Sequence, residues 1–325
     1  ADCVMAGMAR SGNVYALNFA RHLSSIGVEH FGIGRSGPKP TPMWQVEHHY
    51  RFWALHLVDQ LHAYLSVLDT ERPDIIVNFA AQGEGAASFG SDAHYFYTTN
   101  TVGLVRLVDA LRGRDYIKRF VQIGSSEVYG SVDKPATEQS PLNPSSPYGI
   151  SKAAFDQHLA IMHRVHGFPM NVIRPSNAYC PGQQLHRIIP QAIICALSRR
   201  KLKLQGGGRA EKSYIHGTDL SRGIMAVIER GEAGRVYNCG PQSPTAIRTV
   251  AEMVSAATCL DFDELVEMAP DRVGQDGRYW LDSSALRSLD WRPTIDLTFG
   301  IDEMVDWVRK YPELLTTDTA FRLRA

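Results

Sequence analysis

A tyrosine and a lysine four residues apart carry the clearest chemical signal in the sequence. Tyr148 and Lys152 belong to the segment PYGISK at 147–152, and on a helix this spacing places both side chains on one face. A phenol with a pKa of about 10 is a poor base at neutral pH, but an ammonium group one turn away favours the phenolate. The spacing therefore indicates a general base tuned towards neutral pH, although it also occurs in helices without any catalytic role.

A serine-containing segment supports this interpretation. The residues GSSEVYG at 124–130 follow the apolar run FVQI, which is typical of a buried strand upstream of Tyr148. A serine hydroxyl at the end of such a strand could orient the oxygen of a substrate. The two segments together indicate one chemical centre.

The first loop of the chain has the position of a dinucleotide-binding loop. Residues 7–13 (GMARSGN) link an expected strand to an expected helix, where backbone N–H groups can meet a pyrophosphate. We expect Gly7, Ser11 and Gly12 to contact it. The three-glycine fingerprint is incomplete, because its later glycines would fall on Arg10 and Asn13. A simple turn between strand and helix is the alternative.

The end of the second expected strand bears on the choice of cofactor. An NAD site usually has Asp or Glu there, but this sequence reads GIGRS at 32–36. Arg35 and Ser36 could hold a 2′-phosphate, since a guanidinium suits phosphate geometry. This favours NADP over NAD, the alternative being an exposed arginine in a turn rich in Pro and Gly.

The elements that must position these residues alternate between strand and helix. Short apolar runs predict parallel strands covered on both faces, at 3–6, 28–33, 74–80, 120–124 and 170–174. Helical patterns lie between them, at 15–25, 92–110 and 148–166. The alternation predicts an α/β fold with a Rossmann-type doubly wound parallel sheet, whose ligands bind at the carboxyl ends of the strands.

The second half of the chain has a different texture. From about residue 181 a helix at 190–198 is followed by a GGG turn at 206–208 and by short elements separated by Gly and Pro. We expect a dinucleotide-binding domain at 1–180, with strands added from the 210–240 region. Residues 181–325 are expected to form mainly a smaller substrate-binding lobe.

Composition excludes several classes of partner. Lys plus Arg and Asp plus Glu both number 34, without a basic block, so nucleic acid and anionic membranes are not expected partners. Five scattered cysteines without a Cys-x-x-Cys pair indicate a reducing cytoplasm and no structural zinc. No apolar run reaches the length of about 20 residues that a membrane span needs. A stretch with four histidines at 48–62 is interleaved with aromatic residues, so no metal site is expected.

The motifs together resemble a known family. SSEVYG at 125–130 and SPLNPSSPYGISK at 140–152 resemble the extended short-chain dehydrogenase/reductase family, especially its nucleotide-sugar 4,6-dehydratases and epimerases. NFAAQ at 78–82 resembles the family's segment beside the nicotinamide ribose, and residues 99–111 resemble the family's central helix. RPSNAYCPGQQ at 174–184, GGGRAEKSYIHGTDL at 206–220 and the segment 271–293 are similar to later family motifs, the last to that of dTDP-glucose enzymes. The resemblance covers nearly the whole chain.

The resemblance implies a shared first step of the reaction. Tyr148 removes the proton of the sugar's 4-hydroxyl while carbon 4 gives hydride to the cofactor, Lys152 tunes Tyr148 and holds the ribose, and Ser125 hydrogen-bonds the same oxygen. The 4-ketone acidifies the proton on carbon 5, for which Glu127 is the implied base. Ser126 stands where the dTDP-glucose enzymes have an acid for the leaving hydroxyl, whereas the GDP-mannose enzymes also have Ser-Glu.

The resemblance also implies the binding residues. Ala80 and Asn100 fall at cofactor positions of the family. The expected ligands of a nucleotide-diphosphate sugar are Asn177, Gln184, Arg187, Lys212, Arg272 and Gln275. The helices at 92–110 and 148–166 resemble those that pair in the family's homodimers.

Three functions remain open from the sequence. A 4,6-dehydratase for a nucleotide-linked hexose is the leading hypothesis, and a 4-epimerase on the same scaffold is the alternative. An epimerase needs no base at carbon 5, so Glu127 would then be only a surface or helix-terminal carboxylate. A protein that keeps a dinucleotide as a sensor without catalysis is the most distant reading, and the presence of Ser125, Tyr148 and Lys152 argues against it.

Overall fold

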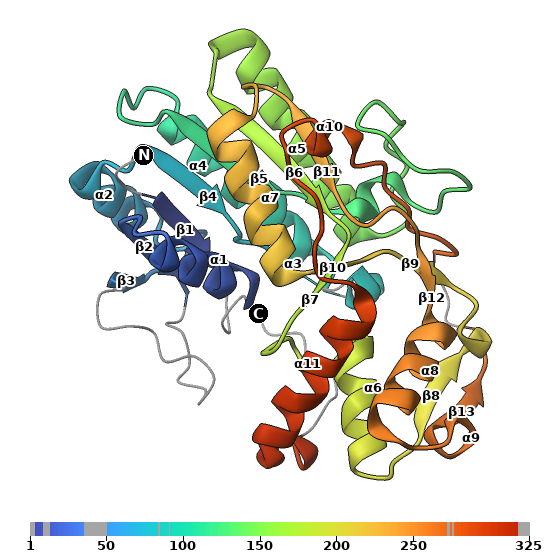
Figure 1. Cartoon of the computed structure of the whole chain (residues 1–325). Coiled ribbons are helices and arrows are strands. Elements are labelled where there is room, and N and C mark those ends of the chain that lie inside the picture. The colour runs from blue at the N-terminus through green and yellow to red at the C-terminus, as the bar shows by residue number, and fades with distance from the viewer. Residues whose placement is uncertain are drawn as a thin grey trace.

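The chain forms an α/β Rossmann-like fold around one parallel sheet (Figure 1). The structure is a computed structural model, and it describes residues 4–8, 14–35, 51–83, 85–90, 92–271, 274 and 276–317. The sheet has the strand order β11-β6-β5-β4-β1-β2-β3. Its strands are β1 (Val4–Met8), β2 (His30–Gly34), β3 (Arg51–Ala54), β4 (Ile75–Asn78), β5 (Arg119–Ile123), β6 (Met170–Pro175) and β11 (Val236–Cys239).

The order of the strands reverses at β1, which gives the sheet its doubly wound topology. β1 pairs in parallel with β2 on one side and with β4 on the other, so the chain first grows towards β3 and then towards β11. The predicted fold class is therefore confirmed. In such sheets a crevice opens at the carboxyl ends of the strands beside the reversal, and ligands bind there.

Helices cover both faces of the sheet, and neighbouring strand residues point into different cores (Figure 1). On one face α1 (Val14–Ser25) and α7 (Gly217–Arg230) pack over Val77 and Val121. On the other, α2 (Leu61–Glu71), α4 (Leu104–Leu111) and α5 (Pro147–His166) pack over Ile76 and Phe120. Strands buried on both faces need apolar residues at every position, which explains the continuous apolar runs in the sequence.

The helix predicted at 92–110 contains a widened turn. It consists of α3 (His94–Tyr97), a π-helical turn η2 (Thr98–Gly103) and α4. The dihedral angles stay in the right-handed helical region at Thr98, Gly103 and Leu104, so the segment does not break. Such π turns are frequent at functional sites, because the extra residue turns a side chain out of the regular helical register.

The elements that lie below the sheet in Figure 1 enclose a third core, whose residues come from Tyr179 onward. It is formed mainly by α6 (Ile188–Leu197), α8 (Ile247–Thr258) and α11 (Leu297–Lys310), together with the strand pair β8 (Leu202–Gln205) and β13 (Val266–Ala269). The strand pair β7 (Asn177–Tyr179) and β10 (Tyr214–His216) leads from the sheet into this region. Shorter elements complete it: β9 (Glu211–Lys212), β12 (Thr245–Ala246), α9 (Phe262–Leu265) and α10 (Ser284–Arg287).

The GGG sequence needs glycine at each position. Residues 206–208 form the turn η4 (Gly206–Gly208), and all three have positive φ angles, of 56°, 65° and 70°. Residues with a side chain rarely adopt this conformation, so the predicted turn requires glycine at all three positions.

The boundary between a domain at 1–180 and a lobe at 181–325 remains a prediction. No helix in the described ranges is long and apolar enough to cross a membrane.

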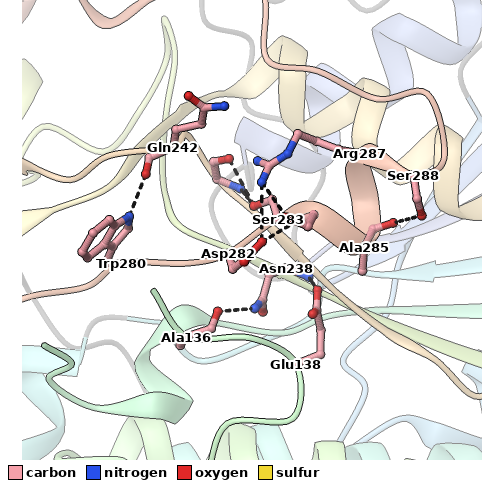
Figure 2. Close-up of polar contacts among 12 residues, drawn as sticks. Ala136, Glu138, Asn238, Gln242, Trp280, Asp282, Ser283, Ala285, Arg287 and Ser288 are labelled. Atoms are coloured by element: carbon pink, nitrogen blue, oxygen red, sulfur yellow. Dashed lines mark hydrogen bonds and ion pairs between the residues drawn. The ribbon is translucent and has the colours of Figure 1, made fainter. Parts of the chain in front are cut away.

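A polar cluster fixes segments from distant parts of the chain to β11 (Figure 2). The backbone N–H of Asn238 donates to Glu138 Oε1 (2.7 Å), and its side-chain amide donates to the carbonyl of Ala136 (2.9 Å). Arg287 of α10 contacts Asp282 at 3.5 Å on the same side. Burial raises the pKa of Glu138, and the nearby charge of Asp282 acts in the same direction. The segment that leads towards α5 is thereby held against the sheet.

Candidate active site

The N-terminus of α5 positions Tyr148. Ser146 caps the helix by accepting a hydrogen bond from the N–H of Gly149 (3.0 Å), and Pro147 fills the first helical position, where no N–H is required. Tyr148 thus lies in the first turn, half-buried, with its ring edge-to-face against Phe96 at 6.3 Å between centroids. Its backbone N–H donates to Ser88 Oγ (3.1 Å).

Lys152 follows one turn later and is almost completely buried. It is 2% exposed, and its ammonium group donates to the carbonyl oxygen of Ile123 (2.7 Å), the last residue of β5. Burial lowers the pKa of Lys152 from 10.5 to about 8, and the charge of Asp156 opposes that shift. Lys152 therefore remains mostly protonated at neutral pH. An ammonium has three donors, so Lys152 also suits ribose hydroxyls at the carboxyl ends of the strands.

A buried ion pair continues the same helix face, and the sequence interpretation missed it. Asp156 and Arg174 have side chains that are 0% and 4% exposed, with Arg174 Nε 2.9 Å from Asp156 Oδ2. Arg174 also donates to the hydroxyl of Tyr129 (2.7 Å), which donates in turn to Asn238 (2.8 Å). The regular spacing of Tyr148, Lys152 and Asp156 was a usable signal, but the partner on β6 was not predictable from it.

The serine segment forms a short helical turn beside α5. Ser125 precedes η3 (Ser126–Tyr129) in extended conformation, and its Oγ accepts from the N–H of Glu127 (3.1 Å). The hydroxyl keeps its own O–H as a donor for a substrate oxygen. Ser126 is 3% exposed and Glu127 is half-buried.

The serine turn and the first turn of α5 approach each other closely. A Cβ added to Gly149 would lie 2.9 Å from the backbone oxygen of Glu127, a distance that real Cβ atoms essentially never show. Glycine at 149 therefore allows the segment that carries Glu127 to pack directly against the residue that follows Tyr148. The structure brings together the segments that carry Ser125, Glu127, Tyr148 and Lys152.

The loop after β4 is joined to α5 by a hydrogen-bond network around Asn100, one of the expected cofactor residues. Asn100 is completely buried in the π turn, where Oδ1 accepts from the N–H of Gln82 (2.7 Å). Its amide donates to the carbonyl of Gln82 and to Ser151 Oγ, both at 3.0 Å. Asn100 thus ties the loop after β4 to α5. In the same loop the N–H of Ala80 donates to Asn78 Oδ1 (3.1 Å).

Part of the expected dinucleotide site can be located. Gly7 lies in β1 between Ile33 of β2 and Asn78 of β4, and Arg35 follows the last residue of β2. Ser11, Gly12 and Ser36 lie outside the described residues. The placed residues are therefore at the carboxyl ends of neighbouring strands, as a dinucleotide site of this fold requires.

The expected substrate ligands come from three elements. Asn177 begins β7, Arg187 is the residue before α6, and Lys212 ends β9. The ammonium of Lys212 donates to the carbonyl of Asp276 (2.8 Å) and lies 3.5 Å from the centroid of the Tyr279 ring. Arg272 and Gln275 lie outside the described residues.

Two buried polar atoms in the described part of the chain after residue 180 have no hydrogen-bond partner. Within the described ranges, Oε1 of Gln184 and the hydroxyl of Tyr214 are inaccessible to solvent and have no hydrogen-bond partner. Buried polar groups are nearly always paired in folded proteins, so each exception needs an explanation. The role of Gln184 as a substrate ligand stays a prediction.

The histidine stretch was considered as a metal site and can be checked in part. Among the described residues, no group of three or more His, Cys, Asp or Glu side chains is placed to hold a metal ion. His56 contacts Asp59 at 2.6 Å, one turn further along the chain.

Comparison with known proteins gives a consistent set of similarities. The model of the NAD dependent epimerase/dehydratase family matches residues 17–240. A dTDP-glucose 4,6-dehydratase of Streptomyces griseus is 38% identical over 241 residues, which are 73% of this chain and 72% of that protein. A trifunctional UDP-glucose 4,6-dehydratase/epimerase/reductase of Arabidopsis thaliana is 31% identical over 259 residues, but the chain spans only 38% of its length.

A solved structure extends the similarity to the fold. The dTDP-glucose 4,6-dehydratase DesIV of Streptomyces venezuelae, with NAD and TYD bound, superimposes with a TM-score of 0.87 at 28% sequence identity. The match covers 96% of this chain and 98% of that one. The similarity therefore includes the region after residue 240, beyond the family model.

Proposed function

This chain belongs to the NAD dependent epimerase/dehydratase family, and we propose that it is a 4,6-dehydratase acting on a nucleotide-linked hexose. The observation that carries the proposal is the placement of Glu127 beside Ser125, on a turn packed against the first turn of the helix with Tyr148 and Lys152. A plain alcohol dehydrogenase needs Ser, Tyr and Lys. A carboxylate at the same place adds a base for a second proton.

In the proposed first step, Tyr148 removes the proton from the 4-hydroxyl of the sugar. Ser125 donates a hydrogen bond to the same oxygen, and the charge on Lys152 stabilises the phenolate of Tyr148. A nicotinamide held at this site would supply the hydride chemistry, taking hydride from carbon 4 and giving it back at carbon 6. Its binding is assigned to Ala80, Lys152 and the strand ends around Gly7.

In the proposed second step, Glu127 takes the proton from carbon 5, which the 4-ketone has made acidic. The C5–H electron pair forms the double bond to carbon 6, and the hydroxyl on carbon 6 leaves with a proton as water. Ser126 cannot be the acid for that hydroxyl, so the proton held by Glu127 serves this purpose. Return of hydride to carbon 6 would then be matched by a proton delivered to carbon 5 from solvent, equal to the proton that Tyr148 took from the 4-hydroxyl and released. The product is a 4-keto-6-deoxy sugar.

Substitution of Glu127 distinguishes the two leading functions. Glu127→Gln keeps the shape of the side chain but removes the base, so it is expected to abolish dehydration. A 4-epimerase would retain its activity. Candidate sugars are incubated with each variant, and the product is examined by mass spectrometry for loss of one water or for an isomer of unchanged mass. Tyr148→Phe is the control, because it is expected to abolish both reactions.

The epimerase remains the second candidate because of Ser126. The residue is buried and lacks the acidic group that the proposed elimination would use most directly. An isomer of unchanged mass formed by both wild type and Glu127→Gln would establish this alternative. Full biological activity of Tyr148→Phe would instead support a non-catalytic sensor.

We propose NADP as the preferred cofactor. Arg35 directly follows β2, where a guanidinium can reach a 2′-phosphate. The solved relatives bind NAD, so the two dinucleotides must be compared directly. Arg35→Ala is expected to weaken NADP binding by roughly 10-fold or more and to leave NAD binding nearly unchanged, since a charge-assisted hydrogen bond contributes about 1.5–3 kcal/mol. Tighter binding of NAD by the wild type would refute the preference.

The proposed substrate is a nucleotide-diphosphate sugar. Asn177, Gln184, Arg187 and Lys212 support this by their chemistry, because cationic and amide side chains are the usual ligands of a diphosphate and of the polar groups of a sugar. Arg272 and Gln275 are assigned to the same ligand by their sequence positions. Denaturing the purified protein and identifying released nucleotide-sugars by mass spectrometry tests the assignment. The cytoplasmic location inferred from the cysteines stays a prediction.

A further inference from the structure

Gly85 lies next to the carboxylate of Glu127. It opens the short turn η1 (Gly85–Phe89) in the loop after β4. A Cβ built on Gly85 would be 2.3 Å from Oε2 of Glu127, 3.2 Å from Cδ and 3.4 Å from Oε1. The carboxylate therefore occupies the space that any other residue at position 85 would fill.

Glycine is needed at position 85 because there is no room for a side chain, and not because of its backbone conformation. Gly85 does not have a φ in the positive region that side chains avoid, so alanine could adopt its backbone conformation. This differs from the GGG turn, where the dihedral angles themselves require glycine. What a side chain at 85 would change is the position of Glu127.

The same turn is bonded to the helix that carries Tyr148. Ser88 is completely buried, and its hydroxyl donates to the carbonyl of Gly85 (2.6 Å). The Oγ of Ser88 also accepts a hydrogen bond from the backbone N–H of Tyr148 (3.1 Å). The turn η1 is thus in contact with the carboxylate of Glu127 at one end and with the first turn of α5 at the other.

We propose that Gly85 is a positioning residue, which sets where the Glu127 carboxylate stands relative to Tyr148. The inference rests on the proposed function, in which Glu127 removes the proton from carbon 5. The atoms that meet the added Cβ are the far end of a flexible side chain, so the protein can accommodate alanine by moving the carboxylate. Such a movement spares the fold, but a displacement of about 1 Å at a reacting group can cost roughly 100-fold in rate.

The test compares two glycines of one loop. Gly85→Ala places a methyl group against Glu127, whereas Gly83→Ala points into open space, with nothing within 4 Å of its Cβ. We expect Gly85→Ala to lower kcat for dehydration by about 10- to 100-fold with little change in KM. Gly83→Ala should behave as the wild type, and both variants should unfold at the wild-type temperature.

Two half-reaction measurements separate displacement of Glu127 from a general defect. Reduction of the bound cofactor in a single turnover depends on Tyr148 and should keep its wild-type rate in Gly85→Ala. Exchange of the carbon-5 proton with deuterium from the solvent depends on Glu127 and should slow by the same factor as kcat. Equal slowing of both steps would contradict the inference, because it would show a disturbed site as a whole.

A double-mutant cycle with Glu127→Asp gives a second test. Aspartate is one carbon shorter and leaves room for a methyl group at position 85. The rate loss of the double variant should therefore be smaller than the product of the two single losses, because the residues are in contact. Independent effects would refute the inference. If the wild type forms no dehydrated product from any sugar, both the proposed function and the inference about Gly85 are refuted. If the wild type is active and Gly85→Ala is as active as Gly83→Ala, only the inference about Gly85 is refuted.

Discussion

Lys152 is subject to two opposing influences on its charge. Burial lowers its pKa to about 8, while the carboxylate of Asp156, one helical turn away, acts to raise it. A charged Lys152 is required in the proposed mechanism, because only the ammonium stabilises the phenolate of Tyr148. The residue is therefore poised close to the pH at which it would lose its function.

We expect the rate of the first hydride transfer to fall as the pH rises through about 8, where Lys152 loses its proton. Single-turnover reduction of the bound cofactor, measured from pH 6 to about 10, would show this limb. Loss of stability through Lys152 cannot explain such a fall in rate. Between about pH 8 and pH 10.5 the unfolded chain binds more protons at Lys152 than the folded chain does, so the contribution of Lys152 to the free energy of unfolding increases with pH. A rate that keeps rising to pH 10 would contradict the assignment.

The same balance predicts that Lys152→Met separates stability from activity. Methionine has a similar length and removes a charge that is 2% exposed, while Asp156 keeps its partner Arg174. Activity should be lost, and the free energy of unfolding in urea should rise by about 1–3 kcal/mol, as for other replacements of buried charges by apolar residues. A less stable variant would show that the bond from Lys152 to Ile123 outweighs the cost of burial.

The sequence predicted candidate catalytic residues, but it did not predict the contacts that hold them in position. Tyr148 and Lys152 could be assigned because their spacing is a property of one helix. The contacts of Gly85 with Glu127 and of Asp156 with Arg174 join residues 42 and 18 positions apart. Neither contact has a local pattern, because the residues meet only after the strands have paired.

At the level of elements, α5 is fixed to the sheet by the ion pair of Asp156 with Arg174. Asp156→Asn leaves the guanidinium of Arg174 buried without its carboxylate, so we expect a loss of about 3–5 kcal/mol in the free energy of unfolding. Glu252→Gln is a matched control, because its helix-surface pair with Arg248 is 47% exposed on both sides and should contribute only about 0.3–0.5 kcal/mol. Equal losses in urea denaturation would refute the structural importance of the buried pair.

The π turn shows what hydrophobic periodicity could not predict at this level. The pattern at 92–110 indicated one regular helix, and the segment is indeed helical almost throughout. The widened turn contains Asn100, which bonds Gln82 and Ser151 from other elements. Hydrophobic periodicity predicts the apolar face of a helix, but it does not predict long-range hydrogen bonds or a widened turn within the helix.

At the level of the whole molecule, the sequence predicted the parallel sheet and most of its strands, but not all of them. The apolar runs identified β1, β2, β4, β5 and β6, and a contribution from 210–240 was expected, where β11 joins β6. The edge strand β3 and the small strand pairs were not predicted. They are four residues long or shorter, and β3 is not fully buried as the equally short β4 is, so a continuous apolar run is not expected at β3.

The outer face of α5 leads to a prediction about assembly. Ile150, Ile161 and Val165 lie on one side of the helix and are 44%, 47% and 61% exposed, opposite the face with Tyr148 and Lys152. Val102, in the π turn packed against α5, is 53% exposed. An apolar stripe of this kind is typical of an interface, and it supports the predicted homodimer formed through the helices at 92–110 and 148–166.

If the predicted homodimer forms, we expect Ile161→Glu combined with Val165→Glu to convert it to a monomer, because each charge would be buried without a partner at the interface. Light scattering at micromolar concentration measures the mass directly. Met268→Glu is the control, since Met268 is 55% exposed on β13, outside the helices proposed to pair, and should leave the mass unchanged. Wild-type protein that is already monomeric would refute the dimer. If the double variant is monomeric yet binds cofactor normally, the two faces of α5 act independently, one in assembly and the other in chemistry.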